Sequence, residues 1–296
     1  MRRRKAYGLP YKGSKNRIAE WVVDSLPAAD TLVDLFAGGC AVSHCAMLSG
    51  KFKRVIANDI SDAPEVFARA VNGDIDVSGF PLTREQFKAS TDTLSQLVYS
   101  YGYDQRSYIY GAEREGVCIA AERMMYGATL AERYAAYKVF IRALHRYLQC
   151  GNNLDRNVSE LQAIECVTRL QAIESINRLQ GIHGACPAAE LETSRCDYRD
   201  FDVPAGSTVY ADPPYNGTTI SQYDGGFAYD AFEDWLAEVD FPVFVSEYTC
   251  PRGCVEIASR GSLSLADHSN STRVVERLFV QERFYDSVMA GDCVEE

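Results

Sequence analysis

Long apolar stretches are missing from this sequence of 296 residues, of which 47% are hydrophobic and 24% are charged. No run reaches the roughly 20 apolar residues that a membrane-spanning helix needs. The basic start of the chain reads MRRRKAYGLPYKGSK. No apolar segment follows it, so it lacks the pattern of a secretory signal. With an otherwise ordinary globular composition, these absences predict a cytoplasmic protein of one large domain or two modest ones.

Metal-ligand patterns are also missing. The ten cysteines are scattered singly, and the chain has only four histidines. The closest cysteine pairs, Cys40/Cys45 and Cys250/Cys254, lack the two-residue gap of a zinc knuckle, and no histidine lies at ligand spacing from them. We therefore expect reduced thiols and no bound metal.

Positive charge is scarce overall, because the formal net charge is −11. The deficit is confined to one part of the chain: residues 181–296 hold 7 basic and 21 acidic residues. By contrast, the first 17 residues hold seven Lys or Arg and no acid. The local field steers a polyanion more than the net charge does, so the composition does not exclude a nucleic-acid partner.

A strand–turn–helix–strand pattern lies near the start of the chain. Short buried strands are expected at 31–36 and 54–58, with a helix at about 41–48 between them and another at about 65–71 after them. Such a βαβ unit implies a parallel sheet with helices on its faces. Later strands are expected at 208–211, 242–246, 273–280 and 282–288, with a helix at about 229–239.

Helical patterns dominate the middle of the chain. They are expected at 83–99, 119–149 and 159–180. No Ser-, Gly- or Pro-rich linker separates this part from the rest. We therefore expect an α/β core domain made of residues 1–72 and 190–296, interrupted by a mainly helical insert at 73–189.

The sharpest feature is the tetrapeptide Asp212-Pro213-Pro214-Tyr215, which directly follows an expected strand. In an open parallel sheet, ligands bind beyond the carboxyl ends of the strands. The prolines fix the backbone and remove donors, which leaves a carboxylate and the Pro213 carbonyl as acceptors beside an aromatic ring. Two acceptors can hold both hydrogens of an exocyclic amine, and the ring can stack on a base flipped out of its helix. The alternative is a turn that only connects two elements, since Asp and Pro are common in turns.

Two further acids lie near or just after the ends of expected strands. Asp34 precedes the glycine turn Phe36-Ala37-Gly38-Gly39-Cys40, which departs from the dinucleotide fingerprint and suits the approach of a ligand with a cationic amino group or sulfonium. Asp59 follows the next strand, where acids typically bind ribose hydroxyls. Taken singly, either acid fits a loop-end or helix-capping role at least as well.

With these segments in view, the sequence resembles Dam-type adenine-specific DNA methyltransferases, most closely their phage and mobile-element branch. In chain order, the resemblance rests on Tyr-x-Gly-Ser-Lys (11–15), Asp-Leu-Phe-Ala-Gly-Gly (34–39), Asn-Asp-Ile (58–60), Cys-Asp-Tyr (196–198) and Asp-Pro-Pro-Tyr (212–215). It covers nearly the whole chain. It implies a Rossmann-like methyltransferase sheet with a helical target-recognition insert. It also implies S-adenosyl-L-methionine as methyl donor, no metal, and adenine N6 in double-stranded DNA as acceptor, as in restriction–modification systems.

The same resemblance assigns roles to residues. Around the donor it places Tyr11, Lys15, Asp34, Phe36, Gly38, Asp59 and Asp197. Asp212 would lie between the donor and the target base, and Pro213, Pro214 and Tyr215 would hold the flipped adenine. Two positions depart from the family pattern, since Tyr11 stands where many relatives have Trp and Cys40 where the turn usually has Gly.

The insert carries its own signal for nucleic acid. Residues 99–147 hold nine of the 18 tyrosines, interleaved with arginines. Arginines contact phosphates or guanine edges and tyrosines stack on bases, but helical aromatics more often belong to a core. We therefore expect DNA contacts from the loop residues Tyr103, Arg106 and Tyr108 before the helical ones.

Two other interpretations stay open from the sequence. The same chemistry suits a different exocyclic amine, such as cytosine N4 or an RNA base. The altered glycine turn and the acidic excess also fit a non-enzymatic DNA-binding protein on a methylase scaffold, although the intact tetrapeptide argues against decay. No arrangement of nucleophile and base supports a Ser or Cys hydrolase.

Overall fold

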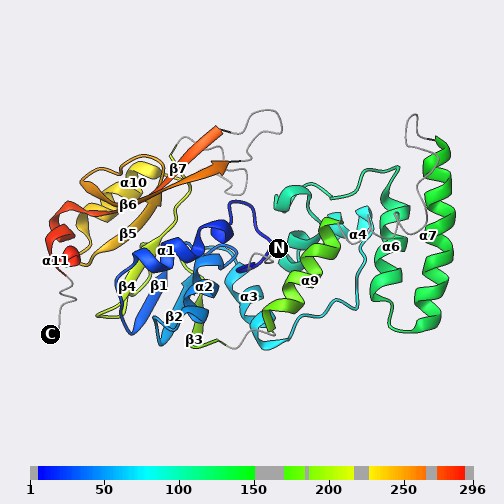
Figure 1. Cartoon of the computed structure of the whole chain (residues 1–296), viewed down its shortest axis with the longest axis horizontal. Helices are drawn as coiled ribbons and strands as arrows, with labels where there is room; N and C mark the ends of the chain where they lie inside the picture. Colours follow the sequence, from blue (N-terminus) through cyan, green and yellow to red (C-terminus); the bar gives the residue numbers. More distant parts are fainter. Residues whose placement is uncertain (1–5, 151–169, 184–186, 217–226, 265–271, 291–296) are drawn as a thin grey trace. The chain divides into compact units, whose positions relative to one another are not determined.

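The computed structural model describes residues 6–150, 170–183, 187–216, 227–264 and 272–290, and Figure 1 traces the chain. The chain divides into two compact units. The first comprises residues 1–9, 13–71 and 185–296, and the second comprises residues 10–12 and 72–184. The first unit holds the sheet, and the described part of the second is mainly helical.

The first unit is an α/β structure on one seven-stranded sheet, in the order β3-β2-β1-β4-β5-β7-β6. Its strands are β1 (Thr31–Asp34), β2 (Arg54–Asn58), β3 (Glu190–Ser194), β4 (Thr208–Ala211), β5 (Val243–Glu247), β6 (Cys254–Ser264) and β7 (Thr272–Gln281). Strands β1 to β5 are parallel, and β7 runs antiparallel to both β5 and β6. The expected Rossmann-like α/β sheet is therefore confirmed. Chain order reverses at β1, which places the ligand side at the carboxyl ends of the central strands.

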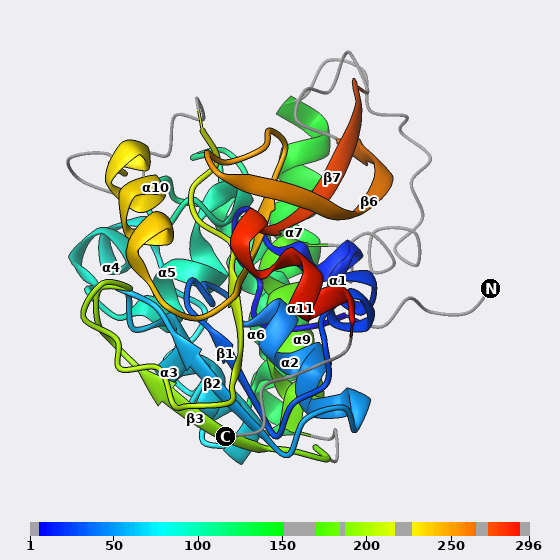
Figure 2. The same ribbon diagram turned by 90° about the vertical axis from the view of Figure 1, so that its left-hand side faces the viewer.

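Helices cover both faces of this sheet. The described helices are η1 (Lys15–Arg17), α1 (Ala19–Ser25), α2 (Ala41–Ser49), α3 (Ala63–Asn72), α10 (Tyr229–Glu238), η3 (Glu282–Phe284) and α11 (Tyr285–Met289). Successive side chains of a strand point to opposite faces. In β1, Val33 joins an apolar cluster with Phe232 of α10, whereas Asp34 accepts a hydrogen bond of 2.6 Å from Ser43 of α2. Helices α2 and α10 thus lie on opposite faces, as Figure 2 shows.

The second unit is built around short and long helices. They are α4 (Arg84–Ala89), α5 (Thr93–Tyr99), η2 (Tyr101–Tyr103), α6 (Glu115–Tyr126), α7 (Leu130–Cys150) and α9 (Gln171–His183). Ala121, Phe140 and Ile173 form the centre of an apolar cluster between α6, α7 and α9. An antiparallel bridge between Ser100 and Tyr108 closes the loop after α5.

Two expected helices are interrupted by local capping. The stretch 83–99 divides into α4 and α5, because Asp92 caps α5 by accepting a hydrogen bond of 2.9 Å from the Ser95 amide. The stretch 119–149 divides into α6 and α7 at Gly127. Of the expected helix at 159–180, only residues 170–180 lie within the described part of the chain, and α9 extends beyond them.

The strand expected at 282–288 is wrong, because this segment forms η3 and α11. Its apolar residues Phe284 and Val288 are four apart, which is the helical spacing rather than the alternation of a strand. Strands β3 and β6 were not expected. Both lie at the edges of the sheet, where polar and glycine residues are tolerated and no continuous apolar run is needed.

Within the ranges given above, no helix combines the length and apolar character that crossing a bilayer requires.

Candidate active site

The carboxyl ends of the central strands are tied together just beyond the sheet. The Leu35 amide donates to the Tyr210 carbonyl at 2.9 Å, and the Ala37 amide donates to the Asn58 carbonyl at 2.8 Å. The turn after β1 is therefore anchored to its two neighbours, β4 and β2. This register brings Asp34 at the end of β1, Asp59 after β2 and Asp212 after β4 to one edge of the sheet.

A cavity of about 190 Å³ opens at this edge. Its walls come from the segments after β1, β2 and β3 and from the start of α10: Leu35, Phe36, Asp59, Ile60, Cys196, Asp197, Tyr198, Arg199, Phe227, Ala228 and Ala231. Three residues expected around a methyl donor, Phe36, Asp59 and Asp197, are among them. The structure thus brings together positions that are far apart in the sequence.

The walls of this cavity include both aromatic rings and carboxylates. The Phe36 ring lies 5.1 Å from the Tyr198 ring and 5.8 Å from the Phe227 ring, centre to centre. The Asp197 carboxylate is held by the Arg199 guanidinium through hydrogen bonds of 2.9 Å and 2.8 Å. The Arg199 side chain thereby keeps the pKa of Asp197 below its usual value. The cavity thus combines apolar rings with carboxylates, a lining typical of small-molecule sites.

Asp59 lines the cavity and also bonds to the glycine turn. Its Oδ2 atom accepts a hydrogen bond of 2.9 Å from the Gly38 amide. Its Oδ1 atom accepts from the amide and the hydroxyl of Ser61, at 2.8 Å and 2.7 Å. Asp59 therefore shapes the turn and also lines the cavity, and its binding of a ribose stays a prediction.

Asp34 is a buried carboxylate with one oxygen unsatisfied. Only 1% of the residue is exposed, and Ser43 donates to its Oδ2 atom at 2.6 Å. Its Oδ1 atom is buried without a hydrogen-bond partner among the described residues. Burial raises the pKa of Asp34 to about 7, opposed by Ser43 and reinforced by the charges of Asp212 and Asp59. Such a group is best satisfied by a cationic ligand.

The turn between Asp34 and α2 has a cysteine, Cys40, directly before the helix. Cys40 takes a left-handed conformation with φ 57° and ψ 36°, which is the region that favours glycine. The turn is braced by the N-terminal segment, because the Leu9 amide donates to the Gly39 carbonyl at 2.6 Å. Any Cβ on Gly8 would lie 2.2 Å from that same carbonyl oxygen, so only glycine fits there.

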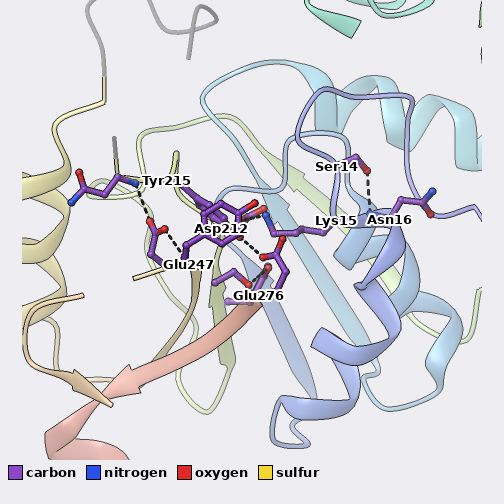
Figure 3. A network of polar contacts seen from close by, with 11 residues as sticks. Ser14, Lys15, Asn16, Asp212, Tyr215, Glu247 and Glu276 are labelled. Atoms are coloured by element: carbon purple, nitrogen blue, oxygen red, sulfur yellow. Dashed lines mark hydrogen bonds and ion pairs between the residues drawn. The ribbon is translucent and has the colours of Figure 1, made fainter. Parts of the chain in front are cut away.

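A second group of contacts centres on the tetrapeptide after β4 (Figure 3). The Lys15 Nζ atom lies 2.8 Å from Asp212 Oδ1 and 4.3 Å from the centre of the Tyr215 ring. Burial raises the pKa of Asp212 to about 6, while Lys15 opposes the rise and the charges of Glu276 and Glu247 add to it. Lys15, expected near the donor, is thus placed against the acid and ring expected at the target base.

Three residues around the tetrapeptide were missed from the sequence. Glu247, at the end of β5, accepts from the Asn216 amide at 3.1 Å and from the Tyr248 amide at 2.6 Å. The Tyr248 ring meets the Tyr215 ring at 4.4 Å in an edge-to-face arrangement. Glu276 of β7 accepts a hydrogen bond of 2.9 Å from the Tyr215 hydroxyl. None of the three belongs to a recognisable motif, and no sequence signal links them to the tetrapeptide.

The remaining candidates lie in the second unit. Tyr11 belongs to the short stretch 10–12 that is grouped with this unit. Tyr103 and the exposed Arg106 lie in the loop closed by the Ser100–Tyr108 bridge. Tyr108 has contacts within its own unit, since its hydroxyl donates to the Leu82 carbonyl at 2.7 Å and the Arg84 guanidinium lies 4.9 Å from its ring centre. The expectation that these loop residues contact DNA stays a prediction.

Potential metal ligands do not gather in the described residues: no group of three or more His, Cys, Asp or Glu side chains has an arrangement that suits an ion.

Comparison with known proteins gives a family match over most of the chain. A family model described as D12 class N6 adenine-specific DNA methyltransferase matches residues 11–250. A stretch of 51 residues, 17% of the chain, is 47% identical to the type II methyltransferase M2.HphI of Haemophilus parahaemolyticus. That match spans only 15% of the relative's length.

Two solved structures are also similar. One is a candidate RNA methyltransferase from Pyrococcus horikoshii, with 12% identity and a TM-score of 0.36 over 91% of this chain and 84% of the other. The second is a candidate methylase from Haemophilus influenzae, with 12% identity and a TM-score of 0.30 over 92% of this chain and 91% of the other.

Proposed function

Because the chain belongs to the family of D12 class N6 adenine-specific DNA methyltransferases, we propose that it transfers a methyl group to N6 of a specific adenine in double-stranded DNA. The family implies S-adenosyl-L-methionine as the methyl donor. The observation that carries the proposal is the position of Asp212, at the carboxyl edge of β4 and within the electrostatic reach of Asp34. The expected donor site and the expected base site thus meet at one edge of the sheet.

The cavity and Asp34 fit the donor. S-adenosyl-L-methionine supplies the methyl group when bound. The rings of Phe36 and Tyr198 suit its adenine, and Asp197 and Asp59 suit polar hydrogens of its adenine and ribose. The unsatisfied Asp34 oxygen suits its cationic groups, and Gly38 lets the ligand approach the backbone closely. No metal has a part in this assignment.

The tetrapeptide activates the acceptor. The lone pair of an aromatic amine is delocalised into its ring, which makes the amine a poor nucleophile. The Asp212 carboxylate and the Pro213 carbonyl would each accept one amine hydrogen, favouring a tetrahedral nitrogen and the positive charge that develops on it. Pro214 and the Tyr215 ring would hold the flipped base.

The proposed hydrogen bond from the amine requires Asp212 to be ionised. With a pKa of about 6, the carboxylate is mostly ionised above pH 7 and can accept hydrogen bonds. Lys15 pairs with Oδ1, and a carboxylate has a second oxygen to offer the amine. After the methyl group has moved, the surplus amine proton leaves to water or through Asp212.

The second unit would read the DNA. We assign residues 73–189 as the target-recognition insert, with residues 1–72 and 190–296 as the catalytic domain. Tyr103, Arg106 and Tyr108 are the contacts we expect first. The basic N-terminal residues support attraction of the polyanion despite the acidic last third. A bacterial or phage-infected cytoplasm is the compartment in which such a substrate is found.

The test is expression in a bacterial strain without adenine methylation, followed by single-molecule sequencing of its DNA. We expect N6-methyladenine at one defined motif, and its loss by at least about a hundredfold in Asp212→Ala. Asp240→Ala, which removes an exposed acid after α10, is the matched control. Methylcytosine, methylated RNA or no product from folded protein would contradict the proposal.

A further inference from the structure

Glu276 is a buried acid that touches the proposed base-binding ring from another strand. It lies on β7, where it pairs in register with Arg260 of β6, and it is 9% exposed. Its Oε2 atom accepts the 2.9 Å hydrogen bond from the Tyr215 hydroxyl. A hydrogen bond to an ionised carboxylate is about twice as strong as one between neutral groups. The contact therefore fixes the outer end of the Tyr215 side chain.

The Tyr215 ring is held at two other places. The Lys15 ammonium lies 4.3 Å from its centre, and the Tyr248 ring meets it at 84° between planes. Ring contacts of these kinds leave freedom to slide, because they prescribe no single bonded atom. Of these three contacts, only the hydroxyl–carboxylate bond specifies one donor and one acceptor, and it fixes the position of the hydroxyl end of the ring, while the Lys15 and Tyr248 contacts limit its rotation.

An acid at this position has an electrostatic cost. Glu276 and Glu247 both place negative charge near Asp212, and like charges close together are unfavourable. A neutral acceptor would anchor the hydroxyl without that cost. A charged anchor is consistent with a ring that must be held more firmly than packing alone would hold it.

We propose that Glu276 is a positioning residue that fixes the Tyr215 ring for stacking on the target base. The proposal rests on the proposed function, because it concerns the same site. Glu276 acts through the Tyr215 hydroxyl and has no direct contact with substrate. A site held in its productive geometry by such supporting contacts reacts faster without binding its substrates more tightly.

The test is a double-mutant cycle on the full-length protein. Methyl transfer from labelled S-adenosyl-L-methionine to bacterial DNA lacking methyladenine is measured at saturating concentrations of both substrates. We expect Glu276→Leu and Tyr215→Phe each to lower kcat about tenfold or more. The KM for the donor stays unchanged. Glu276→Gln keeps an acceptor oxygen for the Tyr215 hydroxyl, so its kcat should lie within about threefold of the wild-type value. Because both changes remove the same hydrogen bond, the kcat of the double variant Glu276→Leu/Tyr215→Phe should be no lower than that of the slower single variant.

The controls separate positioning from stability. Glu192→Leu removes an exposed strand glutamate that pairs with Arg54, and it leaves kcat unchanged. If Glu276→Leu does not fold, Glu276→Asp replaces it, since the shorter side chain withdraws the acceptor.

Three results would overturn the inference while leaving the proposed function intact. The first is independent, multiplying losses in the double variant. The second is a lower melting temperature of Glu276→Leu with normal kcat per folded molecule. The third is coupling to Tyr248→Phe in place of Tyr215→Phe, because Tyr248 is also close to Glu276: burial and then the charge of Glu276 raise the pKa of Tyr248. An inactive wild-type protein would overturn both proposals.

Discussion

The ammonium of Lys15 and the carboxylate of Asp212 form an ion pair of 2.8 Å, with side chains only 12% and 17% exposed. A pair this deeply placed is little screened by salt, and removing one partner leaves a charge without compensation. Lys15 therefore does more than occupy space beside the tetrapeptide, because it favours the ionised form of Asp212.

The first prediction concerns the acidic limb of the pH–rate profile. Activity requires ionised Asp212, so kcat of the wild-type protein should fall as pH falls through about 6. Lys15→Met removes the group that lowers the pKa of Asp212. The pH at which kcat falls should then rise by about one unit. Initial rates between pH 5 and 9 measure this shift.

Lys53→Met is the matched control for this shift. Lys53 forms an ion pair of the same length, 2.8 Å, with Asp30, but in that pair both side chains are largely exposed. The idea would be contradicted if kcat of Lys15→Met fell at the same pH as that of the wild type, or if Lys53→Met showed an equal shift. Either result would show that the buried pair does not set the charge of Asp212.

Donor binding should release a proton. Burial raises the pKa of free Asp34 to about 7, so the group is partly protonated near neutral pH. A cationic ligand favours the ionised form and lowers that pKa, so affinity should rise between pH 6 and 8. Calorimetry of S-adenosyl-L-methionine binding in phosphate and in Tris separates the proton from the intrinsic heat. Asp34→Asn should bind more weakly and without the buffer-dependent heat, and a buffer-independent heat for the wild type would contradict the assignment.

Glu122 should make the second unit less stable as pH rises. This residue of α6 is 1% exposed, and the hydroxyls of Tyr99 and Tyr110 donate to it, the latter at 2.6 Å. Burial raises its pKa from the usual 4.5 of a glutamate to about 7, against the lowering effect of the two tyrosines. Between these two values the folded state holds a proton that the unfolded state has lost. Stability is therefore lost as pH rises through this window.

Glu122→Gln stays neutral and removes this dependence. Between pH 5 and 8, the wild-type free energy of unfolding should fall by about 2 kcal/mol more than that of the variant. Urea unfolding at three pH values gives the comparison. Glu85→Gln, at an exposed position of α4, should keep the wild-type slope. Parallel slopes in wild type and Glu122→Gln would mean that Glu122 is ionised in the folded protein at every pH tested.

Substitutions at two loop residues should distinguish an effect on DNA binding from an effect on stability. Arg106 is exposed, so Arg106→Ala should weaken DNA binding and reduce the slope of log affinity against log salt by about one. Tyr108→Phe loses the hydroxyl that donates to the Leu82 carbonyl, so it should lower the melting temperature and leave the salt slope unchanged. Fluorescence anisotropy with labelled duplex DNA at several salt concentrations, together with thermal unfolding, checks both. A steeper or unchanged slope in Arg106→Ala would remove it from the phosphate contacts.

The sequence predicted the parts of the site that follow strands. Asp34, Asp59 and Asp212 each come directly after or at the end of an apolar run, and parallel pairing brings such positions to one edge. Phe36 and Asp197 were expected through the family resemblance alone, and both line the cavity with Asp59. For the three acids local signals were sufficient, because each is placed by its own strand.

Contacts between distant segments could not be predicted in this way. Glu276 meets Tyr215 only because β7 is inserted between β5 and β6, and nothing local to either residue encodes that order. Strand β3 reads Glu-Leu-Glu-Thr-Ser, with little apolar character, so its place in the sheet depends on pairing with β2. The segment 282–288 was misassigned because a short apolar stretch fits both periods, and its spacing favours a helix.

The order of the strands also affects how the protein is made. Strand β1 pairs with β2, which the ribosome delivers soon afterwards, and with β4, where Leu32 pairs with Thr208. The whole of residues 72–184 is synthesised between these two partners. One hydrogen-bonding edge of β1 therefore stays unpaired while the helical unit is synthesised. Slow translation of that unit would lengthen the period in which the open edge of β1 is exposed to pairing with other chains.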